Sequence, residues 1–255
     1  MKKISIIIPI HDPQELHKDF LVEALESIKM QTLPPKEVLM AGSYRPTYLT
    51  KLLNTFNEFY PVKFVENNSY STSSNINSLV PYCSGSIVKI LFQDDFFISS
   101  TALACTNLVF QESNAVWVAC ASRNYNNKNG SYVHNVIPKY GKKILIGLNS
   151  IGSPSVISFR KDFFLPFNEN LVWMLDCEWY LQMQHRFGNP SLIKDFQIAN
   201  RLHEFQATHK VKRYHKSEVI KVRNLHFKSK VFNPFNWNKN HCICLKNYNE
   251  WKLNL

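Results

Sequence analysis

Short apolar runs alternate with segments of helical spacing along the first 100 residues. Four runs have the length and continuity of strands buried on both faces, and they span residues 4–10, 37–43, 62–65 and 86–92. Between them, apolar residues recur at helical spacing, first at Leu21, Ala24, Leu25 and Ile28 and then at Leu52, Leu53 and Phe56. Strand and helix in alternation predict a parallel α/β half of the nucleotide-binding type.

The rest of the chain has a mixed pattern. One helix and two strands are predicted, at residues 101–110, 115–120 and 156–159. The Asn-rich stretch 124–140 is expected to form a loop or a hairpin around Gly130. A helix stripe that ends at Gly188 follows, at Leu175, Trp179, Met183 and Phe187. Beyond residue 209 the spacing is compatible with helix and with strand.

Two adjacent carboxylates, Asp94 and Asp95, follow the apolar run at 86–92. Such a pair is costly to desolvate unless positive charge compensates it, and open α/β sheets bind ligands at the carboxyl ends of their strands. A divalent cation carrying a diphosphate would compensate both charges, because hard cations bind carboxylate and phosphate oxygens together. A turn or a helix N-cap before residue 98 would also explain the pair.

Five segments of the chain form an ordered set. They read SIIIPI, EALESIKMQT, KEVLMAGS, SSNINSLVPYCSGSIVKILFQDD and GSPSVISFRKDF. In this order the chain resembles family 2 glycosyltransferases of the GT-A fold, from about residue 4 to residue 208. The resemblance implies an α/β fold, a Rossmann-like open twisted sheet flanked by helices. It also implies inverting transfer from a nucleotide sugar, with Mn²⁺ or Mg²⁺ at a DXD-type motif.

The resemblance assigns roles to the residues around this motif. Asp95 matches the metal-ligating position and Asp94 the position near the ribose and the sugar. Gln93 replaces the first Asp of many relatives and is expected to remain a donor contact.

The segment 201–208 resembles the loop that closes over the diphosphate. Within it, His203 would bind the metal or donate to a phosphate oxygen, although a lone His is more often a surface or capping residue. Gln206 and Thr208 are weaker candidates for donor contact.

One departure from the family concerns the nucleobase. Relatives commonly read VDDGS after the second strand, where an acidic residue binds the base, and this chain reads LMAGS. Either backbone groups and Asp12, Ser43 or Glu66 read the base, or the nucleotide is not uridine. A UDP-sugar stays the expected donor. The other nucleotide contacts expected from the resemblance are Pro9, His11 and Asn75.

Asp176, at the start of the second helix stripe, resembles the catalytic Asp of the family's "ED" or "DxE" signature. Inverting transfer needs a carboxylate that removes the acceptor hydroxyl's proton while that oxygen attacks the anomeric carbon. Glu178 is the alternative base, but an offset of two residues places it on a different helix face. Asp176 would otherwise be a first-turn acid that the helix dipole favours.

The charge is concentrated at the C-terminal end. Residues 1–208 are predicted to form the catalytic domain, with a nucleotide-sugar half to about residue 100 and an acceptor half over 101–208. Residues 209–255 contain eleven Lys and Arg against two Glu, a net charge of +9 out of +11 for the whole chain, and they are rich in aromatic residues. Such a basic and aromatic extension suits an anionic membrane surface or is a solvated face. Nucleic acid is not expected as a partner, because no recognition motif accompanies the charge.

Cysteine usage and hydropathy favour a cytoplasmic protein. The six cysteines lack the paired spacing of a zinc site and fit a reducing compartment. No apolar run approaches the ~18 residues that span a bilayer, and no signal peptide is expected at the N-terminus. We therefore expect a cytoplasmic enzyme that binds peripherally to the inner face of the membrane.

The sequence thus predicts a metal-dependent inverting glycosyltransferase. It would move a sugar from a UDP-sugar to a hydroxyl of a glycan or glycolipid acceptor in surface polysaccharide or lipopolysaccharide synthesis. A nucleotidyltransferase acting on sugar phosphates is the first alternative, but the segment PIHDPQE lacks its Gly- and Lys-rich phosphate loop. A catalytically inactive nucleotide-sugar-binding relative is disfavoured by Asp95 and Asp176. A nucleic-acid-binding module would rest on the extension alone.

Overall fold

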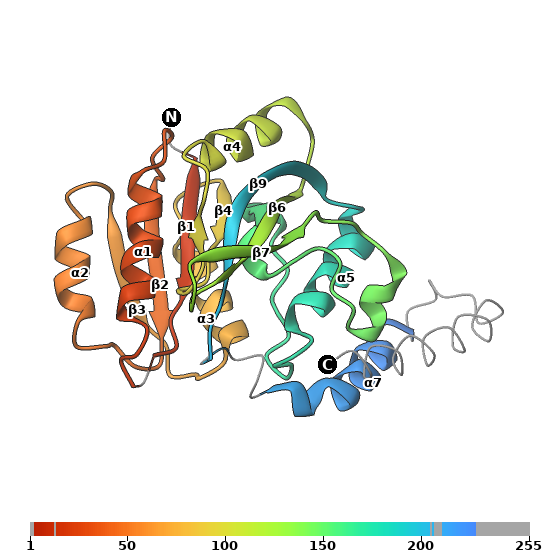
Figure 1. Ribbon diagram of the computed structural model, residues 1–255. Helices are drawn as coiled ribbons and strands as arrows, with labels where there is room; N and C mark the ends of the chain where they lie inside the picture. The colour runs from red at the N-terminus through yellow and green to blue at the C-terminus, as the bar shows by residue number, and fades with distance from the viewer. Residues whose placement is uncertain (1–2, 13, 205, 207–210, 228–255) are drawn as a thin grey trace.

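The computed structural model describes residues 3–12, 14–204, 206 and 211–227, and its described part contains one mixed sheet with helices around it (Figure 1). The strands are β1 (Ile4–Pro9), β2 (Glu37–Gly42), β3 (Val62–Glu66), β4 (Ile87–Ile90), β5 (Phe96–Phe97), β6 (Trp117–Asn126), β7 (Ser131–Val136), β8 (Ile157–Arg160) and β9 (Ser191–Leu202). The α-helices are α1 (Lys18–Lys29), α2 (Leu49–Phe56), α3 (Thr72–Leu79), α4 (Ala102–Glu112), α5 (Leu175–Phe187) and α7 (His215–Phe227). The 3₁₀ helices are η1 (Val80–Tyr82), η2 (Lys142–Ile146), η3 (Pro154–Val156), η4 (Lys161–Phe163) and η5 (Lys212–Tyr214).

The first half is the predicted parallel α/β unit. Strands β3, β2, β1 and β4 lie side by side and all run parallel, with Ile7 of β1 between Leu39 of β2 and Ile90 of β4. Every residue of β1 and β4 is buried, which is why these strands read as continuous apolar runs rather than as alternating ones. Helices α1 and α2 lie next to each other at this end of the sheet (Figure 1).

The second half extends the same sheet with mixed pairing. Strand β8 is antiparallel to β4, β6 is antiparallel to β8, and β9 is parallel to β6. The stretch 124–140, expected to be a loop or a hairpin, forms the β6–β7 hairpin, with Gly130 in the left-handed region at φ 68°. Short β5 then pairs antiparallel with β9.

Strand β9 was not predicted from the sequence. Its pairing with β6 shifts register twice, between Cys120 and Ala121 and between Ala121 and Ser122. Each irregularity moves the following side chains relative to the faces of the sheet. Buried residues therefore do not follow a regular period of two along β9, and alternation could not identify it.

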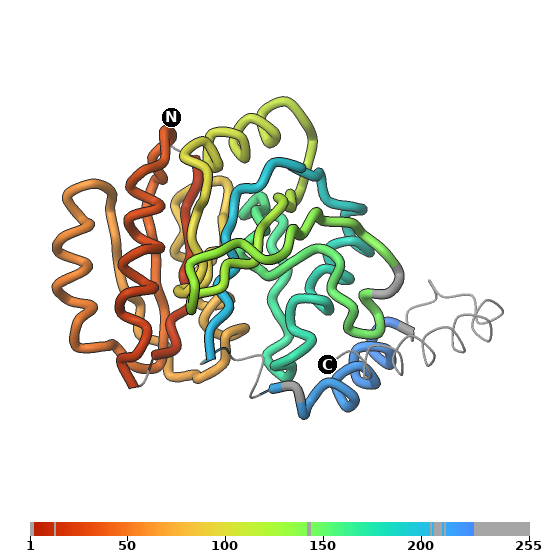
Figure 2. The backbone as a smooth tube through the Cα atoms, viewed as in Figure 1, coloured from red at the N-terminus to blue at the C-terminus, as the bar shows by residue number. Residues whose placement is uncertain are grey.

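The described part of the basic extension folds back onto the body. Within the extension, whose spacing is compatible with helix and with strand, residues 215–227 form helix α7, and its buried side chains are Glu218, Val222 and His226. Helix α7, the blue helix in Figure 2, contacts η2, and its Glu218 contacts residues 172–174 just before α5. Residues 228–255 lie outside the described part, so the boundary at residue 208 stays a prediction. Within the described ranges no helix has the length and apolarity needed to cross a bilayer.

Candidate active site

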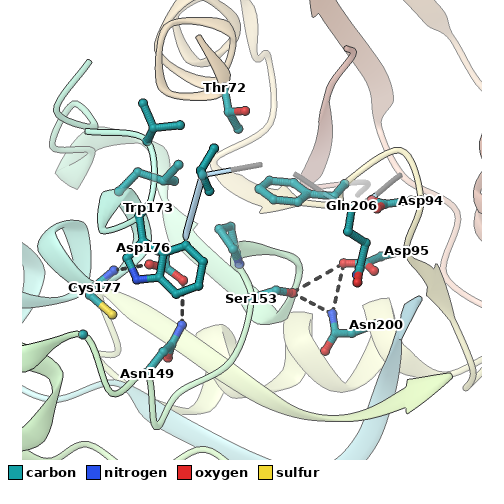
Figure 3. Close-up of a pocket in the computed structure, with 16 residues that line it drawn as sticks. Thr72, Asp94, Asp95, Asn149, Ser153, Trp173, Asp176, Cys177, Asn200 and Gln206 are labelled. Atoms are coloured by element: carbon teal, nitrogen blue, oxygen red, sulfur yellow. Dashed lines mark hydrogen bonds between the residues drawn. The ribbon is translucent and has the colours of Figure 1, made fainter. Parts of the chain in front are cut away.

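A pocket of about 300 Å³ brings together the carboxylates that the sequence singled out. Asp94 and Asp95 lie on one side of it, just after β4, and Asp176 with Trp173 lies on the other, at the start of α5 (Figure 3). Between these walls, Asn149 and Ser153 come from loops and Asn200 comes from β9. The chain therefore places its two predicted reaction centres, 82 residues apart in sequence from Asp94 to Asp176, on a common cavity.

Asp95 is held by strand pairing. Phe96 of β5 pairs with Ala199 of β9, so the residue before β5 meets the residues after Ala199. The Asp95 carboxylate accepts hydrogen bonds from the Arg201 backbone N–H at 3.0 Å, from Asn200 Nδ2 at 3.0 Å and from Ser153 Oγ at 3.4 Å (Figure 3). The side chain is only 5% exposed. Burial, together with the neighbouring Asp94 charge, raises the pKa of Asp95 to about 7.

His203 contacts Asp94. Its Nε2 lies 3.0 Å from Asp94 Oδ2, and Phe20 packs against the imidazole with ring centroids 4.9 Å apart. Gln206 lines the pocket beside these residues and donates from Nε2 to the Arg201 carbonyl. The segment 201–206 therefore does approach the Asp94–Asp95 pair, while Thr208 lies outside the described residues.

The side chains on the Asp94–Asp95 wall of the pocket are of the kinds that bind a hard divalent cation together with phosphate oxygens. Asp94 and Asp95 follow β4, and His203, which follows β9, contacts Asp94. A buried carboxylate with a pKa near neutrality, such as Asp95, is one that a cation would stabilise in its ionised form. Within the described ranges, however, no three His, Cys, Asp or Glu side chains are arranged to hold a metal by themselves. A cation here would need diphosphate oxygens to complete its coordination, which is how Mg²⁺ is commonly held. Asp95 and His203 remain the predicted protein ligands.

Gln93 joins the ends of two central strands. Its Oε1 accepts from the His11 backbone N–H at 2.8 Å, and its Nε2 donates to the His11 carbonyl at 3.1 Å. An Asp at this position could not donate the second hydrogen bond. Gln93 thus links the residues after β4 to the residues after Pro9 of β1, and a direct contact with the donor stays a prediction for both Gln93 and His11.

Asp12 organises the loop after β1. Its carboxylate accepts hydrogen bonds from the backbone N–H groups of Leu16 and His17 at 2.8 and 2.9 Å and from the Tyr48 hydroxyl at 2.7 Å, and it lies 2.9 Å from the His17 ring. Burial alone would raise the pKa of Asp12, but these hydrogen bonds together lower it. The carboxylate is therefore ionised and held by the protein, and its contact with a nucleobase stays a prediction.

The other predicted nucleotide residues lie at the carboxyl ends of β1, β2 and β3. Asn75 in α3 donates to the Ile10 carbonyl at 3.3 Å and accepts from Asn67 at 2.8 Å, so it ties α3 to the end of β1. Ser43 follows Gly42, which pairs with the exposed Glu66. These positions surround the strand ends where open α/β sheets bind ligands, and their contacts with a nucleotide stay predictions.

Asp176 faces the pocket in the first turn of α5. Its Oδ2 accepts from Asn149 Nδ2 at 2.6 Å and its Oδ1 from the Cys177 backbone N–H at 2.6 Å (Figure 3). Asn149 is itself fixed, because its Oδ1 accepts from the backbone N–H groups of Ile151 and Gly152. Burial raises the pKa of Asp176 to about 6, and the two hydrogen bonds limit that rise. Such a carboxylate is an effective proton acceptor near neutral pH.

Glu178, the alternative base, points elsewhere. Its Oε1 lies 3.1 Å from His226 Nε2 of α7, and its Oε2 accepts from Gln182 at 2.6 Å. The side chain is buried and does not line the pocket. The expected separation of Asp176 and Glu178 onto different helix faces is therefore what the structure has, and Asp176 is the one at the cavity.

Asn149, Ser153 and Asn200 were missed by the sequence reasoning although they line the pocket. Asn149 and Ser153 lie in loops, where single Asn and Ser residues are common and carry no periodic signal, and Asn200 lies in β9, which the sequence did not predict. Ser153 lies in the segment GSPSVISFRKDF, so only its position in that segment could have identified it.

The mixed sheet with flanking helices has the architecture of GT-A glycosyltransferases, which confirms the predicted fold. Residues 1–349 of S. aureus TarS, solved in complex with UDP-GlcNAc, match with a TM-score of 0.66 at 17% identity, over 93% of this chain and 76% of that chain. The mannosyltransferase PcManGT from Pyrobaculum calidifontis, solved with GDP-Man and Mn²⁺, matches with a TM-score of 0.63 at 12% identity, over 91% of this chain and 66% of that chain. The sequence matches no family model and has no significant match among curated proteins.

Proposed function

We propose that this chain is a metal-dependent, inverting glycosyltransferase that uses a nucleotide diphosphate sugar. The observation that carries the proposal is the shared pocket, with Asp94 and Asp95 on one wall and the Asp176 carboxylate on the other. A diphosphate on the first wall would place the anomeric carbon within the cavity. An acceptor hydroxyl near Asp176 would then approach that carbon from the opposite side, as inversion requires.

Asp176 would act as the general base. Its Asn149 and Cys177 hydrogen bonds fix the carboxylate in one orientation, and a fixed base within hydrogen-bond reach of the acceptor typically contributes a factor of 10²–10⁴. It would take the hydroxyl proton while the acceptor oxygen forms its bond to the anomeric carbon. The bond from that carbon to the diphosphate oxygen breaks, and the electron pair leaves with the nucleoside diphosphate.

The first wall would hold the leaving group. Asp95 and His203 would hold Mn²⁺ or Mg²⁺, which when bound neutralises the charge that develops on the departing diphosphate. Asp94 would lie near the ribose and the sugar, and Gln206 would approach the diphosphate. Asn200 and the Arg201 backbone N–H orient Asp95 for this role through their hydrogen bonds.

A UDP-sugar is our preferred donor, with a hydroxyl of a glycan or of a lipid-linked glycan as acceptor in surface polysaccharide or lipopolysaccharide synthesis. Solved proteins of the same fold were crystallised with UDP-GlcNAc, UDP and GDP-Man, so uridine and guanine donors both merit a test. The basic extension suits a peripheral position at an anionic membrane, on the cytoplasmic face, where lipid-linked acceptors are reached.

A thermal-shift panel of nucleotide sugars, with and without Mn²⁺, tests the proposal. A ligand that binds only the folded protein raises its stability by about 2.7 kcal/mol at a hundredfold excess over Kd. We expect a UDP-sugar to raise the melting temperature when Mn²⁺ is present, and chelator to remove the shift. Stabilisation that is equal in Mn²⁺ and in chelator would contradict the metal-dependent proposal, and the absence of a shift with any nucleotide sugar would contradict the donor class.

Asp95→Asn is the matched variant for this panel. Asp95 is buried and bonded to Asn200 and the Arg201 backbone, so replacement by Ala would leave those donors unpaired. Asn keeps one oxygen for the Arg201 backbone N–H, and the Asn200 amide can rotate to accept from the new amide. We expect this variant to fold and to lose the Mn²⁺-dependent part of the shift. A full Mn²⁺-dependent shift in Asp95→Asn would remove Asp95 from the metal site.

A further inference from the structure

Helix α7 places a buried carboxylate at the start of the helix that carries Asp176. Glu218 is 2% exposed, and it accepts hydrogen bonds from three consecutive backbone N–H groups. Oε1 accepts from Val172 at 2.9 Å, and Oε2 accepts from Trp173 and Met174 at 2.8 Å each. Burying a carboxylate costs free energy unless its oxygens accept hydrogen bonds. The three backbone N–H groups meet this need for Glu218.

These three residues lead directly into the catalytic turn. Met174 is the N-cap of α5, its carbonyl accepts from the Glu178 backbone N–H at 2.9 Å, and it has no capping hydrogen bond from its own side chain. The Met174 N–H is one of the groups at a helix start that lack partners within the helix, and Glu218 of α7 supplies its acceptor. Asp176 follows two residues after Met174, and Trp173 lines the same pocket.

Helix α7 is fastened at further points on this side of the molecule. His226 lies 3.1 Å from the buried Glu178 carboxylate, and Val222 is fully buried between these two contacts. Gly147 lies close to the first residue of α7 and to Met174. A Cβ added at Gly147 would lie 2.7 Å from His215 Nε2 and 2.9 Å from Met174 Sδ. The start of α5 is therefore enclosed by α7 and by the loop that contains Asn149.

We propose that Glu218 is a positioning residue for the transfer reaction, acting through the backbone of residues 172–174. Asn149 fixes the Asp176 carboxylate from the pocket side, and Glu218 fixes the turn from which Asp176 projects. Helix α7 thus contributes Glu218 to the positioning of the base and is not only a carrier of positive charge. This inference rests on the proposed function, because it assigns Glu218 a role in holding the base of that reaction.

The contact itself is tested without turnover. Hydrogen–deuterium exchange of the full-length protein should show slow exchange of the amides of residues 172–174. Glu218→Gln leaves one carbonyl oxygen and turns an NH₂ group toward a backbone N–H, while Glu218→Ala leaves all three N–H groups without an acceptor. We expect the amide exchange rates of residues 172–174 to rise in the Glu218→Gln variant and to rise further in the Glu218→Ala variant. Unchanged exchange there in both variants would overturn the inference, whatever the enzyme's activity.

The positioning role is tested by the kinetics with which the nucleoside diphosphate is released from UDP-GlcNAc, or from whichever nucleotide sugar stabilises the protein most. We expect kcat to fall about tenfold in Glu218→Gln and up to about a hundredfold in Glu218→Ala, the scale that a misplacement of about 1 Å produces. Donor KM and the Mn²⁺-dependent thermal shift should stay within about twofold, because Glu218 does not touch the donor wall. A fall in kcat accompanied by an equal loss of donor binding would indicate a general structural role and overturn the proposal.

Two control variants separate positioning from stability. Val222→Ala removes buried apolar packing on the same helix without touching the N–H groups of residues 172–174, and Glu112→Gln makes the same chemical change at an exposed site on α4. Assayed well below their melting temperatures, both controls should keep kcat within about twofold. A wild-type protein that releases no nucleoside diphosphate from any nucleotide sugar would refute the proposed function instead. Wild-type kcat in Glu218→Ala would refute positioning alone.

Discussion

The three carboxylates of the pocket differ in their surroundings more than in their chemistry. Asp95 is engaged by three donors, Asp94 contacts His203, and Asp176 is held by Asn149 and its own helix start. Burial brings the pKa values of Asp95 and Asp176 to about 7 and about 6. Carboxylates whose pKa values are moved toward neutrality are concentrated at functional sites, so this feature supports the roles that the sequence suggested.

Asp176 should control the acid limb of the pH–rate profile. The base must be ionised to accept a proton, so with a pKa of about 6 transfer should fall about tenfold per pH unit below that value and level off above it. Asp176→Asn should reduce transfer by about two to four orders of magnitude and remove this limb, with donor affinity unchanged. Glu178→Gln is the matched control, and it should stay active because Glu178 faces His226. The opposite result for the two variants would make Glu178 the base.

The same ionisation can be followed without a substrate. An ordinary Asp ionises near 3.8 and the folded Asp176 near 6, so the folded state holds its proton over a range where the unfolded state has lost it. Wild-type stability relative to Asp176→Asn should therefore fall by about 2–3 kcal/mol as the pH rises from 4 to 7. Urea denaturation of both proteins across this range measures the difference. A constant difference would mean that the pKa of Asp176 is not raised.

At the scale of elements, the periodicity of the sequence predicted the helices and strands whose burial leaves a regular local pattern. The parallel strands β1, β2 and β4 were identified because burial on both faces makes them continuously apolar. The stripe of α5 was identified because one side of that helix packs into the core. Strand β9 was missed because two register shifts interrupt its alternation. Because β9 was not predicted, Asn200 was not identified either. Its contact with Asp95 depends on the pairing between β5 and β9.

The residues of the pocket also fall into those that a local sequence pattern marks and those that only tertiary contacts place. Asp94, Asp95 and Asp176 adjoin elements with clear sequence signals, so their positions could be inferred. Asn149 and Ser153 belong to loops whose geometry comes from tertiary contacts, and no periodic pattern marks them. The contact between Glu218 and residues 172–174 joins segments 44 to 46 residues apart. Nothing local in the sequence distinguishes that Glu from an exposed one.

At the scale of the whole molecule, the basic extension has two parts with different surroundings. Residues 211–227 contribute the buried Glu218, Val222 and His226, and the outer side of α7 exposes Ile220, Lys221 and Leu225. Residues 228–255 contain five Lys against one Glu, together with several aromatic residues. A truncated protein that tests membrane contact should therefore keep all residues up to Phe227, because removing α7 would also remove the Glu218 contact.

Removing residues 228–255 should weaken binding to vesicles rich in anionic phospholipid. Each basic residue near such a surface contributes about 1 kcal/mol, and 1 M salt should weaken binding of the intact protein because the Debye length falls to ~3 Å. Vesicle co-sedimentation measures both effects, and neutral phosphatidylcholine vesicles serve as the control. The truncated protein should keep its melting temperature and its UDP release. Equal binding of the two proteins to anionic vesicles would contradict a role of these residues at the membrane.

The most direct test of the account is the configuration of the sugar released when water replaces the acceptor. The protein is incubated with Mg²⁺ and the α-linked donor that stabilises it most, such as UDP-GlcNAc, and ¹H NMR follows the free sugar before mutarotation. Asp176 lies across the pocket from Asp94 and Asp95, so water activated there should attack from the face opposite the diphosphate. The account predicts that the β-anomer appears first in the wild-type protein and that its release is lost in Asp176→Asn. Initial release of the α-anomer, or equal release by the variant, would contradict it.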